Sequence, residues 1–130
     1  MNPQDLKYTK THEWVRIDGQ TATIGITAFA VSQINEVIFL ELPAKGKAVS
    51  ADKPFGSIES VKAVFDLNSP VNGTVVEVNS GAAEKPEVIT QDPYGAGWMA
   101  KIQMSDPKTF DHLMDANAYE KFIASEAAHH

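Results

Sequence analysis

The chain has 130 residues, of which 43% are hydrophobic and 22% charged, as in a globular protein with one core. We therefore expect a single domain over 1–130, with its core over about 6–123 and a tail over 124–130. The net charge of −6 repels phosphate backbones, so nucleic-acid binding is not expected. The absence of cysteine excludes disulfides, thiolate nucleophiles and thiolate metal sites.

No run of residues approaches the roughly 18 apolar positions of a membrane span, and the first residues lack an apolar signal core. We expect a cytoplasmic protein with no membrane association, or a protein of the mitochondrial matrix if a presequence has been removed. We place no metal on the closing histidines.

Alternating apolar residues and tight turns predict a mainly β chain. Asp18-Gly19 is a strong hairpin turn, and Thr27 is an N-cap for a short helix over 28–34. Residues 82–97 are expected to be irregular apart from a short apolar run at Val88-Ile89. We expect strands over 13–17, 21–26, 36–42, 74–78 and 98–102, with a short strand at Val49.

Residues 55–67 predict a tight β-hairpin with Lys62 at its polar tip. A strand, a glycine turn and a short apolar segment stand on each side of this hairpin. This repeated pattern suggests two similar small sheets that face each other. A compact β-sandwich or flattened barrel, with helices at one end, accommodates these elements.

Two helices are expected at the C-terminal end. Asp106 and Pro107 begin the first, and Asp115 caps the second. Each has an apolar stripe at helical spacing, and we expect both stripes to face the core. The stripes contain Phe110, Leu113 and Met114 in the first helix, and Tyr119, Phe122 and Ile123 in the second.

The usual catalytic signatures are missing. The sequence has no nucleophile elbow, no zinc-binding histidine pair and no nucleotide-binding glycine fingerprint. Gly95-Ala96-Gly97 is a weak candidate for a phosphate cradle. His12 and Glu13 would point to opposite faces of a strand and would not cooperate directly. A small acidic β-domain of this kind is better suited to carrying or binding than to catalysis, so we expect no catalytic residues.

The hairpin motif Ile58-Glu59-Ser60-Val61-Lys62-Ala63, followed by Asp66 and by 69–73, resembles the lipoyl-lysine hairpin of the glycine cleavage system H protein family. The similarity extends from about Leu6 to Phe122. Other landmarks in register are Lys7-Tyr8, His12-Glu13-Trp14-Val15, Gly25-Ile26-Thr27, 37–43, Gly46, Val76-Glu77-Val78-Asn79, Asp92-Pro93-Tyr94-Gly95, Gly97-Trp98 and Lys101-Ile102.

The resemblance implies one lipoyl-carrier domain with the lipoyl/biotinyl-domain-like β-sandwich (the barrel-sandwich hybrid), a short internal helix and C-terminal helices. It implies that lipoate is attached covalently to Lys62, within an attachment motif of Glu59, Ser60, Val61 and Ala63. Biotinyl domains usually place their lysine between two methionines. Val61 and Ala63 flank it here, which disfavours biotin.

A non-catalytic, monomeric carrier in glycine catabolism follows from the resemblance. Its arm accepts the aminomethyl group of glycine from glycine decarboxylase (P protein) and passes it to aminomethyltransferase (T protein). Dihydrolipoamide dehydrogenase (L protein) then reoxidises the arm. A lipoate ligase or an octanoyltransferase supplies the modification. The lack of cysteine agrees with this, because the cofactor brings both sulfurs.

The resemblance also places the loaded arm in a cleft that contains Glu13, Ile26 and Asp66, where the two carboxylates hold the cationic amine. Three positions depart from the family pattern. Gln33 stands where histidine sometimes occurs, Asn35-Glu36 replaces a glycine-acid pair, and Phe65 is bulkier than the usual small residue.

Two other functions remain open. Related carriers serve lipoate relay or sulfur oxidation, and the departures at Asn35 and Phe65 allow that reading. The third possibility is an unmodified β-domain that only binds partners.

Overall fold

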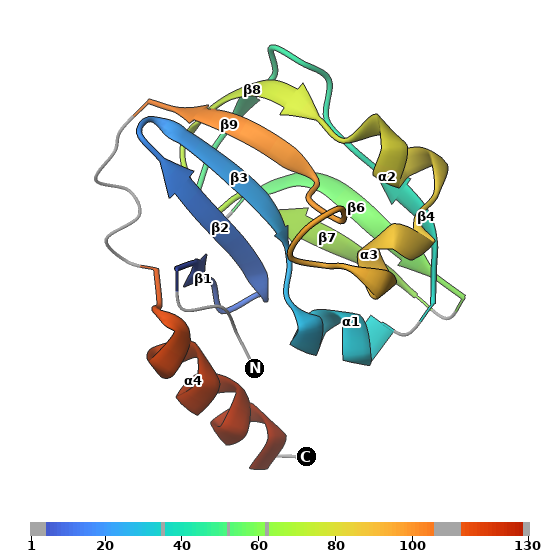
Figure 1. Cartoon of the computed structure of the whole chain (residues 1–130), viewed down its shortest axis with the longest axis vertical. Coiled ribbons are helices and arrows are strands. Elements are labelled where there is room, and N and C mark those ends of the chain that lie inside the picture. Colours follow the sequence, from blue (N-terminus) through green and yellow to red (C-terminus); the bar gives the residue numbers. More distant parts are fainter. Residues whose placement is uncertain (1–4, 35, 52, 62, 106–112, 129–130) are drawn as a thin grey trace.

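The computed structural model describes residues 5–34, 36–51, 53–61, 63–105 and 113–128, and β-strands dominate it (Figure 1). The strands are β1 (Lys7–Tyr8), β2 (Glu13–Asp18), β3 (Thr21–Ile26), β4 (Val37–Glu41), β5 (Ala48–Val49), β6 (Pro54–Ser60), β7 (Val64–Asn68), β8 (Gly73–Val78) and β9 (Ala100–Met104). They form a six-stranded sheet in the order β1-β2-β3-β9-β8-β5 and a three-stranded sheet in the order β4-β6-β7. The mainly β fold is confirmed, as two sheets rather than a closed barrel.

The two sheets are not the similar pair that the repeated pattern suggested, and that expectation is wrong. The segment after β8 forms helices α2 (Ser80–Glu84) and α3 (Glu87–Gln91) instead of a short strand. The Asn79 side chain accepts a hydrogen bond from the Ala82 N–H and caps α2, while Pro86 fits the start of α3. Ile89 is fully buried, so the apolar run at Val88-Ile89 marks a helix face and not a strand.

The other helices begin where the sequence predicts. In α1 (Ala28–Ile34), the Ala30 N–H donates to the Thr27 hydroxyl at 3.2 Å. In α4 (Ala116–Ala128), the Ala118 N–H donates to Asp115 Oδ1 at 2.8 Å. These bonds confirm both N-caps. The helix expected from Asp106 and Pro107, with Phe110, lies outside the described residues. None of the described helices has the length and apolar character needed to cross a membrane.

Two hydrophobic clusters hold the fold together. The larger fills the space between the sheets, and residues of both contribute to it, including Ile24, Ile58 and Ile102. The smaller lies where α4 packs against β1, at one edge of the larger sheet (Figure 1). Tyr119 is buried there, and Phe122 and Ile123 pack against the same cluster, so the second predicted stripe does face a core. Burial of the apolar side chains in these two clusters is the main contribution to the stability of the fold.

Gly73 allows β8 to approach β9 closely. A Cβ atom at this position would lie 2.1 Å from the Gln103 carbonyl oxygen and 2.7 Å from Ile102 Cγ2. We expect Gly73→Ala to lower the free energy of unfolding by about 3 kcal/mol, because the strands must separate to admit the methyl group. Urea titrations of the parent and the variant measure this difference in the free energy of unfolding.

Gly81→Ala is the matched control, since the nearest atom to its added methyl group, Asn79 Oδ1, would be 3.4 Å away. Gly81 lies in α2, where alanine is the better helix former, so this variant should be no less stable than the parent. Equal stability of the two variants would contradict the close approach.

Candidate functional site

The tip of the β6–β7 hairpin is closed by hydrogen bonds between Ser60 and Ala63. The Ser60 N–H donates to the Ala63 carbonyl at 2.8 Å, and the Ala63 N–H donates to the Ser60 hydroxyl at 3.2 Å. Ser60 is buried, whereas the Val61 side chain is 70% exposed. Glu59 is half-buried and pairs with Val64 at the end of the ladder. Lys62 lies outside the described residues, so its place at this tip stays a prediction.

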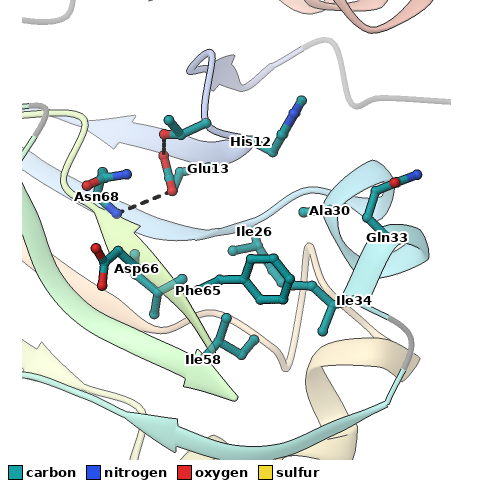
Figure 2. Close-up of a pocket in the computed structure, with 12 residues that line it drawn as sticks. His12, Glu13, Ile26, Ala30, Gln33, Ile34, Ile58, Phe65, Asp66 and Asn68 are labelled. Carbon is teal, nitrogen blue, oxygen red and sulfur yellow. Dashed lines mark hydrogen bonds between the residues drawn. The ribbon is translucent and has the colours of Figure 1, made fainter. Parts of the chain in front are cut away.

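A cleft with a volume of about 320 Å³ opens between the hairpin, α1 and the start of β2 (Figure 2). Its walls are mainly apolar, with a few polar groups. The structure brings together the three predicted cleft residues, Glu13, Ile26 and Asp66, and also the departures Gln33 and Phe65. The full lining is Thr11, His12, Glu13, Ile26, Ala30, Gln33, Ile34, Ile58, Phe65, Asp66, Leu67 and Asn68.

Glu13 is the buried polar group of this cleft, with 1% of its surface exposed. Its Oε1 accepts hydrogen bonds from the hydroxyls of Thr9 (2.7 Å) and Thr11, and its Oε2 accepts one from the Asn68 N–H at 3.3 Å. Burial raises the pKa of Glu13 from 4.5 to about 7, although these bonds oppose the rise. Near neutral pH the carboxyl is therefore poised between its two protonation states.

Phe65 and Asp66 occupy neighbouring positions on β7, at the free edge of the smaller sheet. Phe65 pairs with Ile58, and Figure 2 shows its ring beside Ile34 and Ile26 across the apolar part of the cleft. Phe65 is 41% exposed, so it lies where the cleft meets solvent. Asp66 is exposed, and its carboxylate points away from that ring (Figure 2). The cleft thus has an apolar middle and two carboxyl groups on its lining.

His12 and Glu13 both line the cleft, and the alternation from which we expected opposite faces does not apply, because His12 lies outside the strand. Strand β2 begins only at Glu13, and His12 has a left-handed φ of 71°. Its Nδ1 lies 2.8 Å from the Tyr119 hydroxyl. Alternation along the sequence gives no signal for this turn, which is closed locally: the His12 N–H donates to the Thr9 carbonyl at 3.2 Å, and the Thr9 N–H donates to the Glu13 carbonyl at 3.0 Å.

Sequence reasoning also missed the donors to Glu13. Thr9 and Thr11 stand four and two positions before the glutamate, and their hydroxyls converge on its Oε1. The two threonines, two and four positions before the glutamate, are the only sign of these hydrogen bonds that the sequence offers. Asn68 contributes a backbone N–H, which no side-chain pattern can reveal.

The Gly95-Ala96-Gly97 turn is filled from within the chain. The Gly95 and Gly97 N–H groups donate to the Asp92 carbonyl, and the Ala96 N–H donates to Asp92 Oδ2. A Cβ at Gly95 would lie 2.5 Å from Asp92 Oδ2, which shows how tightly the turn wraps this side chain. The Ala96 N–H therefore holds the Asp92 carboxylate and the two glycine N–H groups hold the Asp92 carbonyl, so nothing here strengthens the weak candidate for a phosphate cradle.

Comparison with known proteins gives one consistent match. The family model described as "Glycine cleavage H-protein" matches residues 6–126. The glycine cleavage system H protein of Symbiobacterium thermophilum is 49% identical over 120 residues, which cover 92% of this chain and 94% of that protein. That of a Nostoc species is 51% identical over 124 residues, 95% of each chain.

A solved structure agrees with the sequence matches. The crystal structure of a glycine cleavage system H protein from Mycobacterium marinum superposes with a TM-score of 0.88 at 37% identity. The match covers 95% of this chain and 99% of that one. The similarity therefore spans both sheets.

The raised pKa of Glu13 predicts a pH-dependent stability. A carboxyl whose folded pKa lies above its unfolded value stabilises the folded state while it is protonated. That contribution is full below pH 4.5 and is lost as the pH rises through about 7. We expect the free energy of unfolding of the parent, relative to Glu13→Gln, to fall by about 3 kcal/mol from about pH 4.5 to about pH 8.

Urea titrations of both proteins across this range measure the difference. Glu84→Gln in α2, where the side chain is exposed, is the control and should show a flat difference from the parent. A flat difference for Glu13→Gln would contradict the assigned burial of its charge.

Proposed function

Because the chain belongs to the glycine cleavage H-protein family, we propose that it is the lipoylated carrier of the glycine cleavage system, with lipoate attached to Lys62. One observation supports this most directly: the hairpin strand β7 leads from the tip to an apolar cleft that contains a buried carboxyl. Along β7, Phe65 lines the cleft, and the Asn68 N–H binds Glu13. An arm attached at the tip and folded back along β7 would end at that carboxyl.

The described residues fit a lipoyl group at this place. Ser60 and Ala63 hold the tip closed, and Val61 is exposed, so a modifying enzyme has access to this end of the hairpin. The apolar middle of the cleft suits a hydrocarbon chain that ends in two sulfurs. When bound, lipoate supplies the disulfide that takes up the aminomethyl group of glycine.

The chain's own residues bind and shield what the arm carries. Glu13 and Asp66 accept charge-assisted hydrogen bonds from a cationic amine. A cation beside Glu13 favours its ionised form, so binding of the amine releases a proton from the fraction that is protonated. Ile26, Ile58 and Phe65 keep water from the bound group. None of these residues makes or breaks a bond to carbon, which is the expected role of a carrier rather than an enzyme.

The partners follow from the same proposal. We infer that glycine decarboxylase loads the arm, that aminomethyltransferase unloads it, and that dihydrolipoamide dehydrogenase reoxidises it. A lipoate ligase or an octanoyltransferase attaches the cofactor. We also propose that the chain acts as one lipoyl-carrier domain over 1–130, as a monomer in the cytoplasm.

The attachment site is tested by intact mass before and after incubation with a lipoate ligase, lipoate and ATP. The parent should gain the mass of one lipoyl group, and Lys62→Arg should gain none, because arginine cannot form the amide. Lys53→Arg, at another exposed lysine, is the control and should be modified like the parent. A lipoyl group on Lys62→Arg would refute the site, and an unmodified parent would favour the simple binding module.

The role of the two carboxyls is tested by the lifetime of the loaded group. In Glu13→Gln/Asp66→Asn the amine loses its charge-assisted bonds, so we expect it to be lost to water at least tenfold faster, which corresponds to about 1.4 kcal/mol. The quantity measured is the formaldehyde and ammonia released from loaded protein in buffer. Glu84→Gln/Glu87→Gln also removes two carboxylates, from exposed positions in α2 and α3, and should decay like the parent. Equal decay of the two double variants would rule out the cleft assignment.

The bulky Phe65 favours one alternative, a lipoate carrier for another system, because its ring occupies part of the cleft. Incubation of the lipoylated protein with purified glycine decarboxylase and glycine separates the two functions. Release of CO2 together with transfer of the aminomethyl group supports glycine cleavage. No transfer to a fully lipoylated protein would favour the alternative.

A further inference from the structure

The Tyr119 hydroxyl is a buried polar group that joins the C-terminal helix α4 to the cleft. It lies 2.8 Å from His12 Nδ1 and 2.7 Å from the Thr27 hydroxyl oxygen. The tyrosine side chain is fully buried, and a buried hydroxyl without hydrogen bonds is costly. These two contacts satisfy it, at the point where two walls of the cleft meet.

His12 is the first of its partners and controls one wall. Its left-handed φ of 71° is unfavourable for a residue with a side chain, so other contacts must hold it. This turn immediately precedes Glu13, so the direction in which that carboxyl enters the cleft depends on it. The Tyr119 hydroxyl fixes the His12 ring, and the ring also packs against Phe29 with centroids 4.8 Å apart.

Thr27 is the second partner and controls the opposite wall. Its hydroxyl accepts a hydrogen bond from the Ala30 N–H at 3.2 Å, and its own N–H donates to the His12 carbonyl at 3.0 Å. Helix α1 starts from this cap and contributes Ala30, Gln33 and Ile34 to the cleft. One hydroxyl therefore connects the turn before Glu13 with the start of α1.

Docking of α4 does not explain why position 119 needs a hydroxyl. The Tyr119 ring stacks on Tyr8 with centroids 4.6 Å apart and an interplanar angle of 9°. Tyr8 and Met114 exchange two backbone hydrogen bonds of 2.8 Å just before the helix. A phenylalanine would keep the stack, the buried area and these bonds. What it would lose is the link to His12 and Thr27.

We propose that Tyr119 is a positioning residue for the cleft, and that its hydroxyl lets the C-terminal helix hold the His12 ring and the Thr27 side chain where the turn before Glu13 meets α1. Without this link the His12 ring and the Thr27 side chain lose the partner that they share, although the backbone bond between Thr27 and His12 remains, and water reaches the Glu13 carboxyl. Shielding of the loaded arm would weaken as a result, and this consequence rests on the proposed carrier function. The expected exposure of Glu13 to water in the unmodified protein does not rest on that function.

The first test uses Tyr119→Phe without any lipoate. Carbon-13 NMR of side-chain carboxyls follows the titration of Glu13 in the unmodified protein. Hydration of the cleft should move the midpoint from about 7 toward 4.5, because burial is what raises it. The control is Tyr8→Phe, which removes the hydroxyl of the other ring in the stack and should leave the midpoint in place. Equal shifts in both variants, or none in either, would overturn the proposal.

A second variant covers the possibility that Tyr119→Phe does not fold. Thr27→Ala removes the other end of the link and should shift the Glu13 midpoint in the same direction. An unchanged midpoint in folded Thr27→Ala, as judged by circular dichroism, would count against the proposal.

The second test uses lipoylated protein loaded by glycine decarboxylase. Tyr119→Phe should lose the aminomethyl group roughly fivefold faster than Tyr8→Phe, as expected for one hydrogen bond. If the parent cannot be loaded, the carrier function fails while the titration still decides the positioning role. If the parent loads and both variants decay alike, the positioning role fails alone.

Discussion

The burial of one carboxyl group is the constraint on which the arrangement of this protein depends. Glu13 is almost fully removed from solvent, and the hydroxyls of Thr9 and Thr11 and the Asn68 N–H surround it. These donors favour the charged form, while burial favours the neutral form, and the pKa of about 7 is the balance between them. A cation placed beside Glu13 would favour the charged form of its carboxyl, which is the interaction that the proposed function requires.

The two sheets are arranged so that this carboxyl meets the hairpin. Glu13 opens β2 in the larger sheet, and Asn68 closes β7 in the smaller one, so their hydrogen bond joins the two sheets at the cleft. The same strand β7 runs from the tip to the cleft, with Phe65 over the apolar middle. In the proposed function, the attachment point and the sheltering cleft therefore lie at the two ends of this strand. Helix α4 is part of this design, because its Tyr119 contacts the residue before Glu13.

Much of this architecture could be predicted from local patterns. The β2–β3 hairpin follows from Asp18-Gly19, α1 from its Thr27 cap, and the β6–β7 hairpin from the alternation over 55–67. The predictions failed where the deciding contact lies far away in sequence or is made by the backbone. Residues 82–97 were expected to be irregular, but part of this segment is helical, because Ile89 is buried and because the Ala96 and Trp98 carbonyls hold the Asn79 side chain that caps α2. The turn at His12 is closed by backbone hydrogen bonds to Thr9, and neither these bonds nor the Asn68 N–H can be seen in the pattern of side chains. The family resemblance named Glu13, Ile26 and Asp66 as cleft residues, but only the fold shows how deeply Glu13 is buried.

The measurement that tests this account most directly is the position of the loaded arm. Protein loaded from glycine labelled with carbon-13 in its methylene group allows isotope-filtered nuclear Overhauser spectroscopy of that group. The account predicts contacts between the labelled methylene and the methyl groups of Ile26 and Ile58, together with a Glu13 carboxyl that is ionised at neutral pH. The account would be contradicted by a methylene group that shows no such contacts and whose NMR relaxation is that of a mobile chain in water.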